Sequence, residues 1–165
     1  MKFLAVGRSA SVRYKDPAFE EALLGLRRGA LITQPTMLSF SGMPKLQLEV
    51  AVREVSQRLG RPLMRLDLSR VVSKYIGETE KNLDQLLRAA EASAAVLLFD
   101  EADALLGRRT EVKDAHDRYA NLEVSYLLAR LEQFRGLIVT TSNSPAEAEK
   151  PKGKFRHLAV RFPPL

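Results

Sequence analysis

The sequence of 165 residues contains no cysteine. Disulfide frameworks, thiolate metal sites and cysteine nucleophiles are therefore excluded, and the absence fits a reducing compartment. Long hydrophobic runs are also missing. The N-terminal apolar run, residues 3–6, is far shorter than the core of a signal peptide, and no stretch approaches the ~20 apolar residues of a membrane-spanning helix. We expect a cytoplasmic chain with no membrane contact.

The composition is that of a folded chain with an excess of positive charge. Hydrophobic residues make up 45% and charged residues 28%, which excludes a disordered or low-complexity chain. The length fits one compact domain. The net charge of +6 raises the hypothesis of a nucleic-acid or other acidic partner.

Short apolar runs alternate with stripes of apolar residues at helical spacing. The first helix is expected from an N-cap at Asp16, with Pro17 at its first position, to a C-terminus closed by Gly29. Strand alternating with helix predicts an α/β fold, with a parallel sheet covered by helices on both faces. The expected strands are residues 37–40, 63–66, 95–99, 137–141 and 158–162, and the further expected helices are 48–59, 83–94 and 119–134.

Polar residues follow three of these predicted strands, at positions 41–42, 100–101 and 142–143. In parallel sheets the ligand site lies beyond the carboxyl ends of the strands. The pair Asp100-Glu101 follows a buried strand, an arrangement that holds Mg²⁺ through one carboxylate and activates water with the other. Acidic residues also cap helices that follow strands, so the pair alone leaves both interpretations open.

Three motifs in order resemble the AAA+ ATPase family: SKYIGETEKNL at residues 73–83, LLFDEADAL at 97–105 and TSN at 141–143. DAHDRYAN at 114–121 is similar to the bacterial type found beside contractile injection systems. The resemblance runs from about Leu38 to Pro163. It implies a three-layer α/β/α P-loop NTPase-like core over residues 37–165, preceded by an N-terminal extension, residues 1–36.

The resemblance also implies roles for individual residues. Asp100 matches the aspartate that helps to hold Mg²⁺, Glu101 the glutamate that polarises the attacking water, and Asn143 the sensor of the γ-phosphate. The motif Tyr75-Ile76-Gly77 matches the pore loop whose aromatic residue grips a polypeptide in the channel of a ring. An ordinary half-buried tyrosine is the alternative for Tyr75. ATP and Mg²⁺ are the implied cofactors.

The phosphate-binding loop departs from this pattern. A working loop reads G-x-x-x-x-G-K-[ST], in which glycines let N–H groups approach the phosphates, lysine neutralises charge and the hydroxyl binds Mg²⁺. This chain has GMPKLQLE in the same eight places, and only Gly42 fits. Gln47, Leu48 and Glu49 replace the glycine, the lysine and the hydroxyl residue. Lys45 cannot substitute for the lysine, because neither a preceding glycine nor a following hydroxyl residue accompanies it.

These replacements predict weak or absent ATP binding. A carboxylate at Glu49, near a helix N-terminus, would repel a phosphate by about 4 kcal/mol at 4 Å and an effective dielectric constant of 20. The missing lysine removes a charged hydrogen bond of about 1.5–3 kcal/mol. Together these losses amount to roughly three to five decades in affinity.

The C-terminal part departs from the family as well. The family places two arginines that act on the neighbouring subunit's nucleotide just before the last strand, and this chain has Lys154 and Phe155 there, with Arg156 one place later. Lysine lacks the planar fork of arginine, and Arg156 would serve only after a one-residue shift. Lys154 and Arg156 are therefore candidate trans-acting residues only. The chain ends at Leu165, so the family's helical lid and its sensor 2 arginine are expected to be absent.

Three functional hypotheses follow. The first is an AAA+-like domain, impaired in ATP binding and hydrolysis, that acts as a non-hydrolysing or regulatory subunit beside other AAA+ subunits or in a protein complex. The second is an active remodelling ATPase with an atypical loop. The third is a nucleic-acid-binding module, for which a solvated basic face or protein-docking patch is the favoured alternative. It would use the basic residues near the C-terminus: Lys150, Lys152, Lys154, Arg156 and Arg161.

Overall fold

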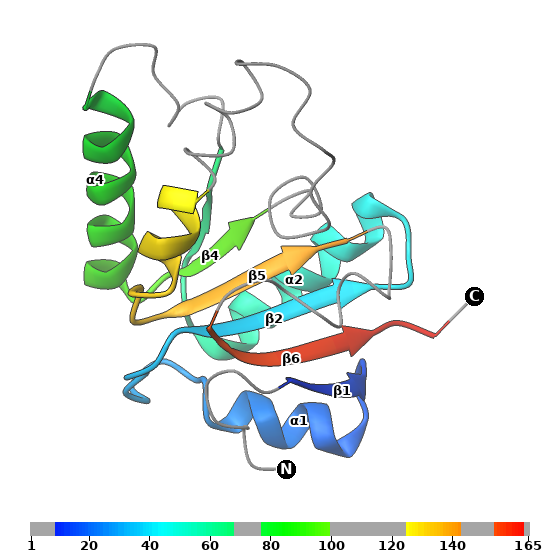
Figure 1. The fold of residues 1–165 in the computed structure, drawn as a ribbon. Helices are drawn as coiled ribbons and strands as arrows, with labels where there is room; N and C mark the ends of the chain where they lie inside the picture. The colour runs from blue at the N-terminus through cyan, green and yellow to red at the C-terminus, as the bar shows by residue number, and fades with distance from the viewer. Residues whose placement is uncertain (1–8, 68–76, 100–124, 143–153, 164–165) are drawn as a thin grey trace.

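The computed structural model describes residues 9–67, 77–99, 125–142 and 154–163. These residues form a six-stranded parallel sheet in the order β1-β6-β2-β5-β4-β3, shown in Figure 1. The strands are β1 (Ser9–Arg13), β2 (Thr36–Ser41), β3 (Leu63–Arg65), β4 (Val96–Phe99), β5 (Leu137–Thr141) and β6 (Arg156–Arg161). The helices are α1 (Pro17–Leu24), α2 (Lys45–Leu59) and α4 (Glu78–Ser93), and residues 125–131 are also helical.

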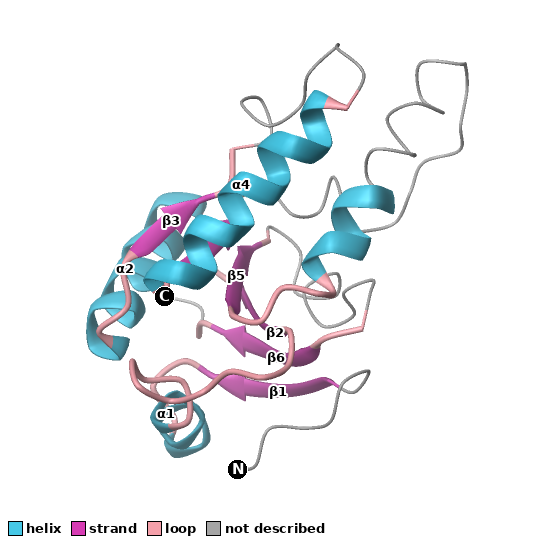
Figure 2. Cartoon of the chain, turned by 90° about the vertical axis from the view of Figure 1, so that its left-hand side faces the viewer, coloured by secondary structure: helices cyan, strands magenta, loops and turns pink. Residues whose placement is uncertain are grey.

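Helices cover the sheet on both faces, as Figures 1 and 2 show. Side chains alternate along a strand, so Leu38 and Phe40 of β2 pack with α1 and α2, whereas Met37 packs with α4 and the helix at 125–131. All six residues of β2 are buried, because a central parallel strand is covered on both sides. The predicted three-layer α/β architecture is confirmed.

Several helix boundaries differ from the prediction. α4 begins at Glu78, five residues before the predicted start at position 83, and the helix at 125–131 ends three residues before position 134. α1 ends at Leu24 instead of continuing toward Gly29, because the amides of Gly25 and Leu26 bond to carbonyls three residues back and form tight turns. These turns carry the Leu26 side chain into the core. α2 begins at Lys45, three residues before the predicted start at position 48.

Strand β1 was not predicted from the sequence. It pairs in parallel with β6, with Ser9 opposite His157 and Arg13 opposite Arg161. The described part of the N-terminal extension is therefore built into the same sheet as the C-terminal strand. Among the described helices, none is long and apolar enough to span a membrane.

Candidate functional site

The carboxyl ends of β2, β5 and β4 lie side by side in the sheet. Phe40 of β2 pairs with Thr141 of β5, and Phe99 of β4 pairs with Thr140. The amide of Ser142 donates to the Phe40 carbonyl at 3.0 Å, so the end of β5 stays beside β2. The strands that precede the predicted chemical residues therefore end at one edge of the sheet, where parallel α/β folds bind ligands.

Most of the predicted catalytic and pore residues lie outside the described part of the chain. These are Asp100, Glu101, Asn143, Tyr75 and Ile76. Gly77 is described: it is the N-cap of α4 and has a φ of 82°, a backbone conformation that glycine adopts readily. The roles assigned to all these residues remain predictions.

The connection from β2 to α2 is only three residues long, Gly42 to Pro44. The amides of Gln47 and Leu48 both donate to the Pro44 carbonyl, at 3.0 and 3.1 Å, and thus belong to the first turn of α2. The alignment with the family places positions 42–49 in the phosphate loop, with the helix expected from position 48. In this structure positions 45–47 are already helical.

Gly42 lies against the end of β6. Its φ is 102°, and a Cβ at this position would lie 2.6 Å from the carbonyl oxygen of Phe162. The Phe162 amide in turn donates to the Ser41 carbonyl at 2.9 Å. Both the backbone angle and the close approach require glycine here.

Leu48, which occupies the place of the loop lysine, faces the core. Its side chain is 1% exposed and belongs to the cluster that contains Val52 and Phe40. On the same helix Leu46 is 77% and Val50 is 64% exposed. The start of α2 therefore has a buried leucine where the loop lysine would be, and it exposes apolar side chains at positions 46 and 50.

Glu49 lies in α2 and has a charged partner that the sequence alone did not reveal. It is the fifth residue of α2, and its Oε1 lies 3.3 Å from Nη1 of Arg65, which belongs to β3. The guanidinium offsets the carboxylate's charge. The repulsion of a phosphate by Glu49 is consequently smaller than the sequence alone suggested.

Arg156, a candidate trans-acting residue, lies at the opposite edge of the sheet, at the start of β6. Its Nε and Nη2 donate to Oγ1 of Thr36 at 3.0 and 2.8 Å. Burial lowers the pKa of this guanidinium. Lys154, two residues earlier, is exposed.

A buried polar chain crosses the central strands and was not predicted. Oγ1 of Thr140 donates to Oγ of Ser39 at 2.9 Å, and Nε2 of His157 lies 2.8 Å from that same Oγ. Burial lowers the pKa of His157 to about 4, so the imidazole is neutral at pH 7. Oγ of Ser41 is buried without a hydrogen-bond partner. The hydroxyl residues at positions 36, 39 and 41 of this buried strand were the signal in the sequence that could have revealed the chain.

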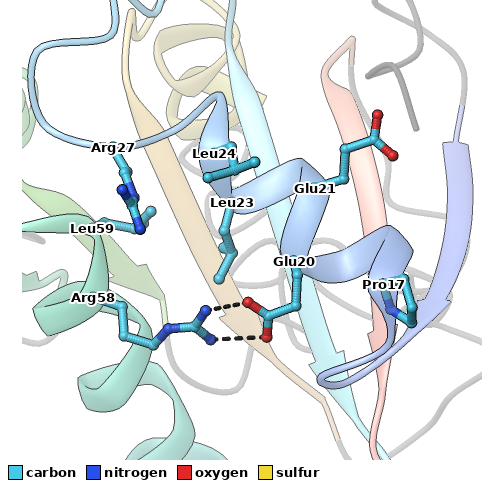
Figure 3. Close-up of a pocket in the computed structure, with 8 residues that line it drawn as sticks. All are labelled: Pro17, Glu20, Glu21, Leu23, Leu24, Arg27, Arg58 and Leu59. Atoms are coloured by element: carbon cyan, nitrogen blue, oxygen red, sulfur yellow. Dashed lines mark hydrogen bonds and ion pairs between the residues drawn. The ribbon is translucent and has the colours of Figure 1, made fainter.

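A pocket of about 360 Å³ lies between α1 and the C-terminal half of α2, as Figure 3 shows. Glu20 and Arg58 form a two-pronged ion pair across it, above a floor that includes Leu23 and Leu59. The described residues contain no group of three or more side chains suited to a metal ion. This pocket is separate from the turn at Gly42.

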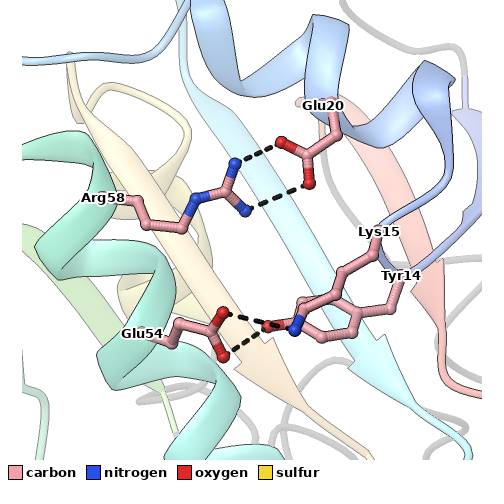
Figure 4. A network of polar contacts seen from close by, with 5 residues as sticks. All are labelled: Tyr14, Lys15, Glu20, Glu54 and Arg58. Carbon is pink, nitrogen blue, oxygen red and sulfur yellow. Dashed lines mark hydrogen bonds and ion pairs between the residues drawn. The ribbon is translucent and has the colours of Figure 1, made fainter.

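A polar network beside this pocket joins the N-terminal segment to α2 (Figure 4). The Tyr14 hydroxyl donates to Oε2 of Glu54 at 3.0 Å, and Nζ of Lys15 lies 3.5 Å from Oε1. Burial and the Glu54 carboxylate raise the pKa of Tyr14. Its ring stacks on Phe162 with centroids 4.3 Å apart. Tyr14 therefore connects α2 with the end of β6.

Comparison with known proteins places this architecture in a family. The family described as "ATPase family associated with various cellular activities (AAA)" matches residues 50–161, more than half of the chain. A proteasome-activating nucleotidase of Methanoregula boonei is 31% identical over 70% of this chain and 28% of its own length. An uncharacterized AAA family ATPase, y4kL, of Sinorhizobium fredii is 29% identical over 72% of this chain and 36% of its own length.

A solved structure supports the same assignment at the level of the fold. The FIGL-1 AAA domain in complex with ADP superposes with a TM-score of 0.56 at 21% identity, covering 92% of this chain and 56% of that one. The chain thus spans about a third of the length of the two sequence relatives and about half of this structure. From the family match and the parallel sheet with its flanking helices, we conclude that the chain belongs to the AAA family of ATPases.

Proposed function

We propose that this chain is an AAA+ domain impaired in ATP binding and hydrolysis, which acts as a non-hydrolysing or regulatory subunit in a protein complex. The observation that carries the proposal is the short turn from Gly42 to Pro44. A phosphate loop needs several free amides before its helix begins, but here the amides of Gln47 and Leu48 are bonded within α2. ATP and Mg²⁺ are expected to bind weakly or not at all.

The burial of Leu48 supports the same proposal. Because this side chain packs in the core, the place of the loop lysine supplies no charge to a phosphate. The family match begins at residue 50, after the eight places of the loop, in keeping with a divergence in this segment. We regard this as a selective loss of the phosphate-loop residues, since the residues that match the family's other nucleotide-handling positions, Asp100, Glu101 and Asn143, are retained in the sequence.

Calorimetric titration of the purified chain with Mg-ATP tests the proposal. We expect no saturable heat at micromolar nucleotide. A micromolar dissociation constant would overturn it, and would favour the second hypothesis, an active remodeller. That hypothesis also requires phosphate release that disappears in Glu101→Gln.

The proposed partners are other AAA+ subunits in the cytoplasm. The pore-loop motif Tyr75-Ile76-Gly77 supports contact with a polypeptide, and the motif at residues 114–121 supports a setting beside bacterial contractile injection systems. A nucleic-acid partner is disfavoured, because a solvated basic face or a protein-docking patch also explains the basic residues near the C-terminus, of which Lys150 and Lys152 lie outside the described residues. Tyr75→Ala should abolish binding of an unfolded polypeptide in a pull-down, whereas Tyr126→Ala should retain it.

A further inference from the structure

Arg61 is a buried arginine that follows α2 directly after Gly60. Arg61 is only 7% exposed and lies just before β3, at the amino-terminal end of that strand. The guanidinium donates four hydrogen bonds, all to backbone carbonyls. The acceptors are Leu26 at 2.7 Å, Arg27 at 3.1 Å, Ala30 at 3.2 Å and Ala94 at 3.1 Å.

These carbonyls replace the carboxylate that usually accompanies a buried cation. A buried guanidinium is costly unless it is paired or fully hydrogen-bonded. In the part of the chain that the structure describes, Arg61 has no salt-bridge partner, and both burial and the charge of Arg28 lower its pKa. Ala94 is the C-cap of α4, and the negative end of the helix dipole at this position favours a cation.

The four acceptors belong to two connections that are far apart in the sequence. Residues 26–30 link α1 to β2, whereas Ala94 links α4 to β4. The planar guanidinium reaches both at once, with Nε and Nη2 on one connection and Nη1 on the other. The single ammonium group of a lysine cannot reproduce this fork.

We propose that Arg61 is a conformational lock that couples the connection at residues 26–30 to the C-terminal end of α4, so that loosening either one loosens the other. The connection lies outside residues 50–161, the part that matches the family. The lock therefore ties a segment beyond the family match to a helix of the AAA core. α4 begins directly after the predicted pore loop, so the lock would hold that helix against a pull on Tyr75; this last point alone rests on the proposed function.

Hydrogen–deuterium exchange of the full chain without nucleotide tests the lock. In Arg61→Lys we expect the amides of Ala30 and Ala95 to exchange at least tenfold faster together, while the amides of β5 keep their rates. Arg53→Lys, an exposed change on α2, is the matched control and should leave all these rates unchanged. Acceleration of only one of the two amides, of neither, or of β5 to the same extent overturns the proposal.

A second substitution separates coupling from two independent contacts. Ala30→Gly loosens the first connection without removing its carbonyls. It should accelerate exchange at Ala95 in the wild-type background, and add nothing there in the Arg61→Lys background. An equal effect in both backgrounds, or none in the wild type, overturns the lock. Because no ATP or polypeptide is present, this result does not depend on whether the proposed function holds.

Discussion

At the scale of single residues, Gly42 and Gly29 form a natural pair for testing the turn after β2. Their φ angles are 102° and 96°, but a Cβ on Gly29 meets nothing within 4 Å whereas one on Gly42 meets the Phe162 carbonyl at 2.6 Å. Gly29→Ala should lower the free energy of unfolding by about 1–2 kcal/mol through backbone strain alone. Gly42→Ala should lower it by at least twice as much in urea denaturation. Equal losses would show that the close approach is relieved without cost.

Leu48 offers a second test at this scale, because it stands in the place of a lysine. Leu48→Lys should destabilise the chain by about 2–5 kcal/mol, since it removes a buried leucine and brings a charge into the core. Leu46→Lys, two residues earlier and largely exposed, should change stability by less than about 0.5 kcal/mol. Thermal unfolding measures both, and a tolerated Leu48→Lys would contradict the packing of α2 described above.

His157 predicts a pH dependence of stability. Its pKa is about 4 in the folded chain and 6.5 in the reference state, so protons bind more tightly to the unfolded chain. Stability is therefore complete above pH 6.5 and falls as the pH drops from 6.5 toward 4, by roughly 3 kcal/mol. His157→Gln removes this titration, so its urea midpoint should fall less steeply over that range. Parallel pH profiles for the two proteins would contradict the prediction.

At the scale of elements, Tyr14 is the test of how the N-terminal segment is held. Tyr14→Phe keeps the stacking on Phe162 but removes the bond to Glu54, and should cost about 1 kcal/mol. Tyr14→Ala also removes the ring and should cost about 3–5 kcal/mol. Urea denaturation should separate the two variants, and exchange in β1 should rise more in Tyr14→Ala. Similar losses would mean that the ring contributes little.

The sequence predicted the central elements better than their boundaries. β4 is a continuous apolar run, and β2 and β5 combine apolar residues with small hydroxyl residues, since burial on both faces leaves little room for charged side chains. The start of α2 was missed because Pro44 provides no side-chain cap and the apolar stripe becomes regular only from Leu48. β1 was missed because its sequence, SASVR, has little strand preference; pairing with β6 makes it a strand.

At the scale of the whole molecule, the fold decides which of the predicted charged site residues are paired with other side chains. Motif spacing predicted which residues belong to the site, but the partners of these residues come from distant strands. Glu49 meets Arg65 from β3, and Arg156 meets Thr36, 120 residues away in the sequence. Such pairs depend on strand order, which no local pattern specifies. The net charge of +6 therefore says less about ligands than the pairing of individual side chains does.

Repair of the phosphate loop tests whether the rest of the molecule still supports nucleotide binding. The quadruple variant Lys45→Gly, Gln47→Gly, Leu48→Lys and Glu49→Thr restores the family pattern and should unwind the first turn of α2, because two glycines replace helical residues. With Glu101→Gln added to prevent turnover, Mg-ATP at a hundred times its dissociation constant should raise the free energy of unfolding by about 2.7 kcal/mol.

The matched control for this repair omits Leu48→Lys and keeps the other three substitutions. It frees the same amides but supplies no lysine, so it should gain less stability from Mg-ATP than the full repair. A full repair that gains nothing would place the defect outside residues 42–49. A repair that binds ATP would instead mean that the start of α2 alone accounts for the impairment, since the sheet edge around it is unchanged.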